Sequence, residues 1–178
     1  MHDYTNAKNI QVVLVDDEDN VLGNKEKFAT HKHPVLLHRA VSVVIYDNDR
    51  RQILLQKRAD GKPLWPLYWT NACCTHPTPD ESYDATALRR LEEEMGFKTQ
   101  LEEAFRFKYK ASYDDAWGEH ELDVVFVGAY EGEIKPDPEE VADYKWIYID
   151  KLLDDVVENS QSYTPWFKII LERLHPLH

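Results

Sequence analysis

The stretch "ESYDATALRRLEEEMGF", residues 81–97, is the most regular segment of the 178-residue chain. Its apolar side chains recur at helical spacing, at Ala85, Leu88, Leu91 and Met95. Asp80 or Ser82 can cap the start of a helix, and Gly96 can end it. The pattern predicts an amphipathic helix over residues 82–96.

Strand patterns surround this helix in the sequence. The apolar runs in 10–16, 105–113, 121–130 and 144–150 each predict a strand, and residues 39–58 predict a hairpin around the turn "DNDR". The polar segment 23–33 predicts a short helix or a loop, and "DKLLDDVV" and "TPWFKIILERL" predict closing helices. Thr164 is the expected N-cap of the last one. We expect one mixed α/β (α+β) domain over residues 1–178, with a sheet between helices.

Composition limits the partners of this domain. The net charge of −12, from 21 basic and 33 acidic side chains, repels nucleic acid, so an anionic ligand needs a local basic pocket. Apolar runs stop near seven residues, too short to span a membrane. The first residues, "MHDYTNAKN", lack the pattern of a signal peptide, so we expect a cytoplasmic protein.

Both cysteines of the chain lie in "NACCTHP", residues 71–77, with a histidine two positions later. A disulfide, a metal site and a reactive thiol are the competing interpretations. A reducing cytosol disfavours a disulfide, and neighbouring cysteines strain its geometry. The metal site and the reactive thiol both stay open on these residues alone.

Histidines and carboxylates supply a candidate metal site. His31, His38 and His76 could join Glu119 and Glu121, which share one face of a strand because they are two residues apart. Such a set would suit Mn²⁺, Mg²⁺ or Zn²⁺ with an open position. Eight histidines make chance sets easy, so spacing alone does not decide. The other histidines considered, His33, His120, His175 and His178, are interpreted as surface residues.

The predicted helix also has charged pairs four residues apart, Arg89 with Glu93 and Arg90 with Glu94. Such pairs most often lie on a solvated face. In a functional alternative, Arg90 meets an anion and Glu94 meets a cation, and a diphosphate with Mg²⁺ supplies both. Further basic candidates are Lys27, Arg58 and Lys62.

The segment 81–97 resembles the Nudix box, whose tail reads R-E-U-x-E-E-x-G-U after a glutamate eight positions upstream. The residues in register are Glu81, Arg89, Glu93, Glu94 and Gly96. Two positions depart from it: Arg90 replaces a metal-binding glutamate of the hydrolases, and Thr75 replaces the initial glycine. The missing carboxylate argues against pyrophosphohydrolase activity.

Together with "TNACCTHP", "WPLYWTNA", "KFATH…LLH" and "GEHELD", the chain resembles the type I isopentenyl-diphosphate Δ-isomerases from about Lys27 to Trp166. The resemblance implies a Nudix-like mixed β-sheet core flanked by helices. It also implies the conversion of isopentenyl diphosphate into dimethylallyl diphosphate in isoprenoid biosynthesis. The implied partner is this small-molecule substrate, and we expect a monomer or a weak dimer.

The resemblance implies a role for each candidate residue. A metal would be held by His31, His38, His76, Glu119 and Glu121, and Mg²⁺ on the diphosphate by Glu94. The diphosphate would be held by Lys27, Arg58, Lys62, Thr75 and Arg90.

The catalytic residues implied are Cys74, Glu121, Tyr109 and Trp166. Cys74 and Glu121 would form the acid–base pair, with Tyr109 hydrogen-bonded to the acid. Trp166 would face a carbocation, or it is simply a core aromatic residue. Cys73 is expected to be a packed residue. A Nudix diphosphate hydrolase and a non-catalytic diphosphate- or metal-binding module are the alternatives, and residues 1–26 suggest no function.

Overall fold

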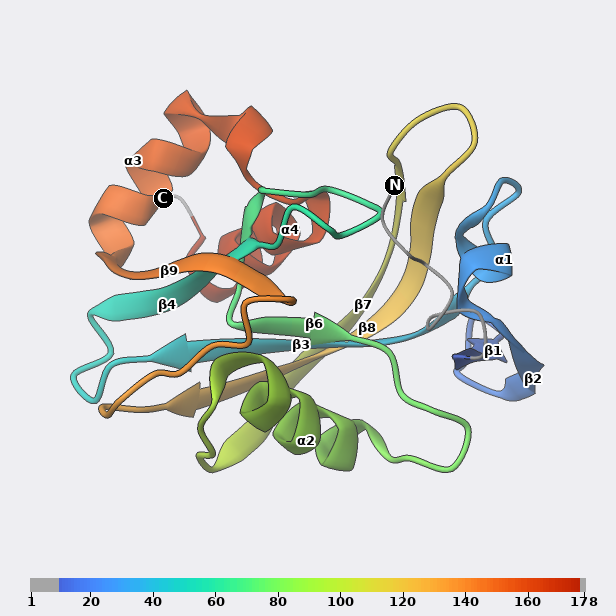
Figure 1. The fold of residues 1–178 in the computed structure, drawn as a ribbon, viewed down its shortest axis with the longest axis horizontal. Helices are drawn as coiled ribbons and strands as arrows, with labels where there is room; N and C mark the ends of the chain where they lie inside the picture. The colour runs from blue at the N-terminus through green and yellow to red at the C-terminus, as the bar shows by residue number, and fades with distance from the viewer. Residues whose placement is uncertain (1–9, 177–178) are drawn as a thin grey trace.

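The computed structural model describes residues 10–176, and within them nine strands form one mixed sheet with helices on both faces (Figure 1). The strands are β1 (Gln11–Val15), β2 (Val21–Glu26), β3 (His38–Tyr46), β4 (Gln52–Arg58), β5 (Trp69–Thr70), β6 (Cys73–Thr75), β7 (Leu101–Ser112), β8 (Gly118–Ala129) and β9 (Val141–Tyr148). The helices are α1 (Lys27–His31), α2 (Tyr83–Met95), α3 (Ile149–Glu158), the 3-10 helix η2 (Ser160–Ser162) and α4 (Pro165–Leu174). The predicted fold class is confirmed. No helix in residues 10–176 is long and apolar enough to cross a membrane.

The predicted hairpin of β3 and β4 forms the centre of the sheet, but its strands pair only beside their turn. The paired residues there are Ile45 with Leu54 and Tyr46 with Ile53. Further along, β3 pairs instead with β6, and β4 pairs with β5 and β9. The hairpin therefore opens away from its turn, and β6 fills the edge that β3 exposes.

The parallel pairing of β3 with β8 fixes the register of the site. It runs from His38 beside Glu121 to Tyr46 beside Ala129. β7 pairs with β8 on its other edge as an antiparallel hairpin. Residues of β3 and β8 are buried on both faces of the sheet, which explains their nearly continuous apolar sequences.

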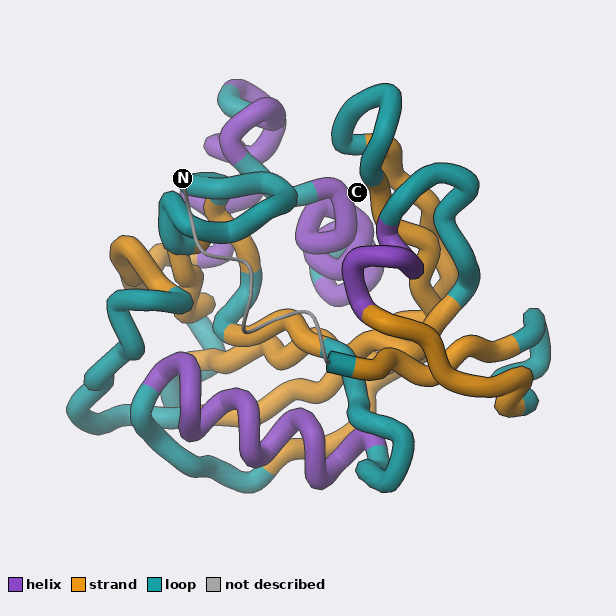
Figure 2. The backbone as a smooth tube through the Cα atoms, turned by 45° about the vertical axis from the view of Figure 1, so that its right-hand side comes forward, coloured by secondary structure: helices purple, strands orange, loops and turns teal. Residues whose placement is uncertain are grey.

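Alternating residues of these strands supply two separate cores. Val43 and Val124 pack on the face covered by α2, whereas Val44 and Val125 pack on the face covered by α3 and α4, against residues such as Phe167. Figure 2 shows α2 on one side of the strands and the other long helices opposite. This alternation is the two-residue period of a strand.

Helix α2 begins and ends as predicted, but only part of its buried face is the predicted one. Ser82 caps its start, and Gly96 ends it with φ of 77°. Ala85 and Leu88, expected in the core, are exposed, whereas Ala87, Leu91, Glu94 and Met95 are buried. Leu91 and Met95 are thus buried as expected, but the polar residues Thr86 and Glu94 share their face, so the apolar spacing identified only part of the buried face.

The short helix predicted within residues 23–33 is present as α1, but the segment also contains the end of strand β2, which was not predicted. Because β2 is an exposed edge strand, it lacks the apolar alternation that reveals strands. One prediction about histidines needs correction. His175 is half-buried and hydrogen-bonds to Tyr46 Oη at 2.9 Å, so it is not a free surface residue. His33 and His120 are also half-buried, and His178 lies outside the described residues.

Candidate active site

The five proposed metal ligands come from different elements and converge at one end of the sheet. His31 ends α1, His38 begins β3 and His76 directly follows β6, while Glu119 and Glu121 lie two apart on β8. The register of β3 with β8 puts His38 directly beside Glu121. Their convergence therefore follows from the strand pairing.

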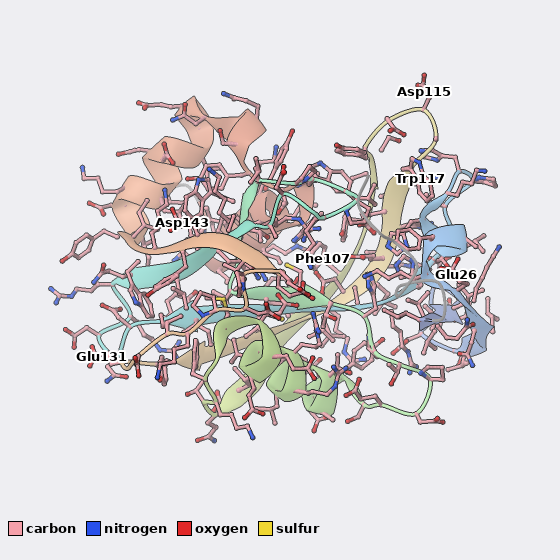
Figure 3. All side chains as sticks on the ribbon, in the orientation of Figure 1. Glu26, Phe107, Asp115, Trp117, Glu131 and Asp143 are labelled. Atoms are coloured by element: carbon pink, nitrogen blue, oxygen red, sulfur yellow. The ribbon has the colours of Figure 1, made fainter. Side chains whose placement is uncertain are left out.

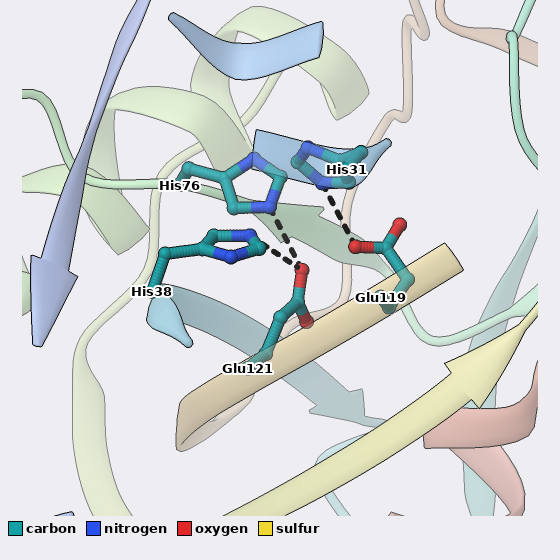
Figure 4. A group of neighbouring side chains, drawn as sticks. All are labelled: His31, His38, His76, Glu119 and Glu121. Carbon is teal, nitrogen blue, oxygen red and sulfur yellow. Dashed lines mark hydrogen bonds and ion pairs between the residues drawn. The ribbon is translucent and has the colours of Figure 1, made fainter. Parts of the chain in front are cut away.

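The five side chains point toward one another (Figure 4), and one ligand atom from each lies within 4.8 Å of the others. His31 Nε2 lies 2.8 Å from Glu119 Oε2. His76 Nε2 and His38 Nε2 lie 2.8 and 3.5 Å from Glu121 Oε1. Three imidazoles and two carboxylates at these separations can hold a divalent metal ion.

Backbone contacts fix the tautomers of two of these imidazoles. The Nδ1–H of His31 donates to the carbonyl oxygen of Lys27 at 2.6 Å, and that of His38 donates to Leu36 at 2.8 Å. A carbonyl oxygen only accepts, so Nε2 of each ring presents a lone pair to the cluster. Both Nε2 atoms and Glu119 Oε2 are buried without a hydrogen bond of normal geometry. A metal ion would satisfy these atoms, so the residues fit one.

The pKa values of the two carboxyl groups are shifted in opposite directions. Burial, together with the charge of Glu121, raises the pKa of Glu119. Burial would also raise the pKa of Glu121, but the neighbouring imidazoles of His38 and His76 outweigh it and hold that pKa well below its usual range. Tyr109 Oη donates to Glu121 Oε2 at 2.5 Å, so both oxygens of Glu121 are engaged. Glu121 is therefore ready to act as an ionised group.

A cavity of about 490 Å³ lies beside the cluster, a volume suited to a small ligand. Its polar lining comprises Glu26, Lys27, His31, Ser42, Arg58, Lys62, Cys74, Thr75, His76, Tyr109, Glu119 and Glu121. Phe28, Leu64, Trp117 and Trp166 add an apolar wall. In Figure 3, Trp117 lies at the start of β8, on the side of the molecule where Glu26 precedes α1.

Three cations line this cavity from three elements. Lys27 begins α1, and Arg58 ends β4. The guanidinium of Arg58 donates to the backbone carbonyls of Trp65 and Leu64 at 3.0 and 2.9 Å, and so holds the loop that contains Lys62. Burial lowers the pKa of Lys62 to about 8, and neighbouring cations add to the effect. This is the local basic pocket that an anionic ligand of an acidic protein requires.

Cys74 is held by a buried polar cluster. Its thiol donates to Asn71 Oδ1 at 3.1 Å and accepts a hydrogen bond from Trp166 Nε1 at 2.9 Å. Asn71 Nδ2 donates to the backbone carbonyls of Val43 and Cys73, which fixes the amide orientation. Burial raises the pKa of Cys74 to about 12, so a proton stays on its sulfur at neutral pH.

Trp166 is both buried and directed at the cavity. It is 4% exposed, and its Nε1 also donates to Thr70 Oγ1 at 3.0 Å. Trp65 packs edge-on against it, with ring centroids 5.3 Å apart. The guanidinium of Arg58 lies over the indole ring, 5.4 Å from the centroid. The core and active-site interpretations of Trp166 are therefore compatible.

Arg90 and Glu94 lie behind the cavity and are not among its lining residues. Arg90 Nη2 donates to Glu94 Oε1 at 2.7 Å and to Glu140 Oε1 at 3.1 Å. Glu94 is 2% exposed, and its other oxygen accepts from Gln56 at 3.1 Å. The pair is therefore part of a half-buried network and is not a solvated ion pair on the helix surface.

Four residues near the proposed ligands were missed by the sequence reasoning: Ser42, Thr70, Asn71 and Glu140. Ser42 Oγ lies 4.0 Å from Cys74 Sγ and donates to the buried Asp123 at 2.7 Å. Thr70 and Asn71 lie within "WPLYWTNA", three and two positions before Cys73, so proximity in sequence was an available signal. Ser42 and Glu140 gave none, because their contacts are purely tertiary.

Comparison with solved structures places the fold among Nudix proteins. DR0079 from Deinococcus radiodurans superimposes with a TM-score of 0.77 at 13% identity, covering 93% of this chain and 99% of that one. A MutT protein from Methanosarcina mazei gives 0.64 at 19% identity, covering 77% and 91%. The family model of the NUDIX domain matches residues 36–167.

Sequence comparison with curated proteins assigns the chain to one group within the NUDIX domain family. An isopentenyl-diphosphate Delta-isomerase 2 from Aromatoleum aromaticum is 40% identical over 164 residues, which is 92% of this chain and 86% of that protein. An isopentenyl-diphosphate Delta-isomerase from Serratia proteamaculans is 40% identical over 163 residues, 92% and 90% of the two chains. One from Nocardia farcinica is also 40% identical, over 90% and 92%. At these identities and coverages, and with the cluster and the cavity described above, this chain belongs to the isopentenyl-diphosphate Delta-isomerases of the NUDIX domain family.

Proposed function

We propose that this protein isomerises isopentenyl diphosphate to dimethylallyl diphosphate. The observation that carries the proposal is that Cys74 and Glu121 line one cavity together with three cations and an indole ring. A protonated thiol and an ionised carboxylate are what a protonation–deprotonation reaction needs. The names of the relatives support the same activity.

The diphosphate of the substrate would bind at the basic side of the cavity. Lys27, Arg58 and Lys62 line it and can donate to phosphate oxygens, as can the hydroxyl or backbone N–H of Thr75. Arg90 would contribute from the network behind the cavity. These contacts anchor the charged end of the substrate and leave its hydrocarbon end beside Cys74 and the aromatic wall.

The reaction moves a double bond by adding and removing protons. An alkene is a very weak base, so the acid must be well placed in a pocket that excludes water. Adding a proton to the terminal carbon leaves a tertiary carbocation, and removal of a proton from C2 gives the product. Cys74 and Glu121 are the acid–base pair, and Tyr109 holds Glu121 through its 2.5 Å hydrogen bond.

The carbocation must be stabilised without being captured by water. The ring of Trp166 supplies a π-face at the cavity, where a cation–π contact is worth about 2 kcal/mol in a desolvated site. Leu64, Trp117 and Phe28 add apolar surface that excludes nucleophiles. The same wall therefore serves catalysis and protects the intermediate.

The cluster of His31, His38, His76, Glu119 and Glu121 would hold Mn²⁺, Mg²⁺ or Zn²⁺. When bound, the metal ion would tune the pKa of Glu121 through its charge. Glu94 would hold the Mg²⁺ that accompanies the diphosphate. A cytoplasmic location and a monomeric or weakly dimeric state remain predictions.

The test is incubation of the purified protein with isopentenyl diphosphate and Mg²⁺, followed by NMR. We expect dimethylallyl diphosphate to form without phosphate release. Phosphate or pyrophosphate release without isomerisation would instead identify a Nudix hydrolase and refute the proposal. Binding without any conversion would identify a non-catalytic module.

A further inference from the structure

Glu140, in the turn before β9, bridges two cations that the proposed function assigns to the diphosphate. Its Oε2 forms an ion pair with Lys62 Nζ, and its Oε1 accepts from Arg90 Nη2 at 3.1 Å. The three side chains are 21–24% exposed, so these ion pairs are neither free in solvent nor fully buried. A carboxylate thus already occupies donors that a phosphate would use.

The backbone of Glu140 is fixed, and its side chain is the movable part. Its N–H donates to the carbonyl oxygen of Asp137 at 3.0 Å, and its carbonyl accepts the N–H of Ala59 at 3.0 Å. The next residue, Val141, begins β9 and pairs with Arg58. A change of side-chain rotamer can therefore withdraw the carboxylate without moving the sheet.

Both terminal nitrogens of Arg90 already donate to carboxylates, whereas its Nε is buried without a partner among the described residues. Nη2 donates to Glu94 at 2.7 Å and to Glu140 at 3.1 Å, which uses both of its hydrogens, and Nη1 donates to Glu93 at 2.8 Å. Glu94 is buried and also held by Gln56. The longer contact to the more exposed Glu140 is the one that can be given up. Arg90 Nη2 becomes available to another anion only when Glu140 leaves it.

We propose that Glu140 is an internal anion that engages Lys62 and Arg90, two donors of the diphosphate subsite, in the free protein and is displaced from them when a diphosphate binds. The inference rests on the proposed function, because that function supplies the diphosphate. Carboxylate and phosphate oxygens use the same lysine and arginine donors, so the two anions compete. Glu140 holds Lys62 and Arg90 together in the free protein, at the cost of weaker diphosphate binding.

The test compares Glu140→Gln with Glu139→Gln. Both variants remove one negative charge, but the Glu139 carboxylate makes no ion pair among residues 10–176. Isothermal titration calorimetry with inorganic pyrophosphate and Mg²⁺ measures binding without turnover. We expect Glu140→Gln to bind pyrophosphate about tenfold more tightly than the wild type, since two partly exposed ion pairs no longer compete. Glu139→Gln should stay within about twofold.

A second experiment, in the Lys62→Met variant, tests whether the gain in pyrophosphate affinity arises through Lys62. In Lys62→Met one of the two competing contacts is already gone, so adding Glu140→Gln should give a smaller gain than it gives in the wild type. Glu140→Ala should act in the same direction as Glu140→Gln, and thermal unfolding checks that each variant folds. Unchanged or weaker pyrophosphate binding in folded Glu140 variants overturns the inference.

The outcome is separable from that of the proposed function. Isomerase turnover by the wild type, with Glu140→Gln binding pyrophosphate no more tightly, refutes the role of Glu140 alone. Tighter binding by Glu140→Gln in a protein that does not isomerise supports the displaced anion and refutes the activity. Failure of the wild type to bind pyrophosphate overturns the inference, because no diphosphate subsite would exist.

Discussion

Replacing Trp166 by Phe and by Leu separates two contributions of this indole to the proposed reaction. Both changes remove Nε1–H, which donates to Cys74 Sγ at 2.9 Å and to Thr70 Oγ1 at 3.0 Å. Phe keeps an aromatic face at the cavity, whereas Leu keeps apolar bulk without a π-system. The loss common to both variants therefore reports the hydrogen bonds, and the difference between them reports the π-face.

The expected magnitudes follow from the contacts. A hydrogen bond of this kind contributes about 1 kcal/mol, so both variants should lose about five- to tenfold in kcat. A cation–π contact of about 2 kcal/mol corresponds to a further loss of about thirtyfold, and tenfold at the least, for Leu alone. Arg58 also lies over the indole ring. Because Arg58 is assigned to the diphosphate, loss of that contact should appear mainly in KM.

The assay is the rate of dimethylallyl diphosphate formation at saturating isopentenyl diphosphate, with thermal unfolding as the check on folding. Trp65 is the matched control, because it packs against Trp166 and is 5% exposed but, within residues 10–176, makes no hydrogen bond to Cys74. Its Phe and Leu variants should have nearly equal kcat. Equal kcat for Trp166→Phe and Trp166→Leu would refute carbocation stabilisation. The role left to Trp166 would then be to shape the pocket and exclude water from it.

Other predictions test the residue assignments. Cys74→Ala should abolish turnover in a folded protein, whereas Cys73→Ala should cost little activity and about 1 kcal/mol of stability; a folded but inactive Cys73 variant would mean that the thiol was wrongly chosen. His76→Ala and Glu119→Gln should each lower both the rate and the metal content measured by elemental analysis, and full metal retention would count against the cluster. Arg90→Glu adds a carboxylate to three others and should weaken diphosphate binding without creating a hydrolase; strong phosphate release with isomerisation kept would contradict this. In D₂O, deuterium should enter the new methyl group of the product, and its absence on NMR analysis would exclude acid–base transfer through the protein.

The sequence predicted the larger elements because their patterns are local. β3 and β8 are buried on both faces and therefore show long apolar runs, and α2 has its cap at Ser82 and its end at Gly96. The short strands β5 and β6 were not predicted, since two or three residues make no pattern. The opening of the β3–β4 hairpin was also missed, because it depends on pairing with β6 and β9.

The site was predictable to a different degree. Spacing placed Glu119 and Glu121 on one face, but it could not choose three of eight histidines; the resemblance to a family made that choice. Neither the spacing nor the family resemblance predicted the buried polar cluster that holds Cys74. The role of Asn71 depends on its bonds to the backbone of Val43 and Cys73, which only the folded chain brings together.

The two adjacent cysteines show how a small strand determines the site. β6 pairs with β3 so that Ser42 lies opposite Cys74 and Val43 lies opposite Cys73. Successive side chains of a strand point to opposite faces, so Cys73 enters the core beneath α2, where it is 0% exposed, and Cys74 enters the cavity. A shift of this register by one residue would exchange the two thiols and move His76 away from Glu121. The proposed assignment of Cys74, and not Cys73, as the reactive thiol therefore follows from strand register. The proposed metal cluster depends on the same register, because its ligand His76 lies in the same segment.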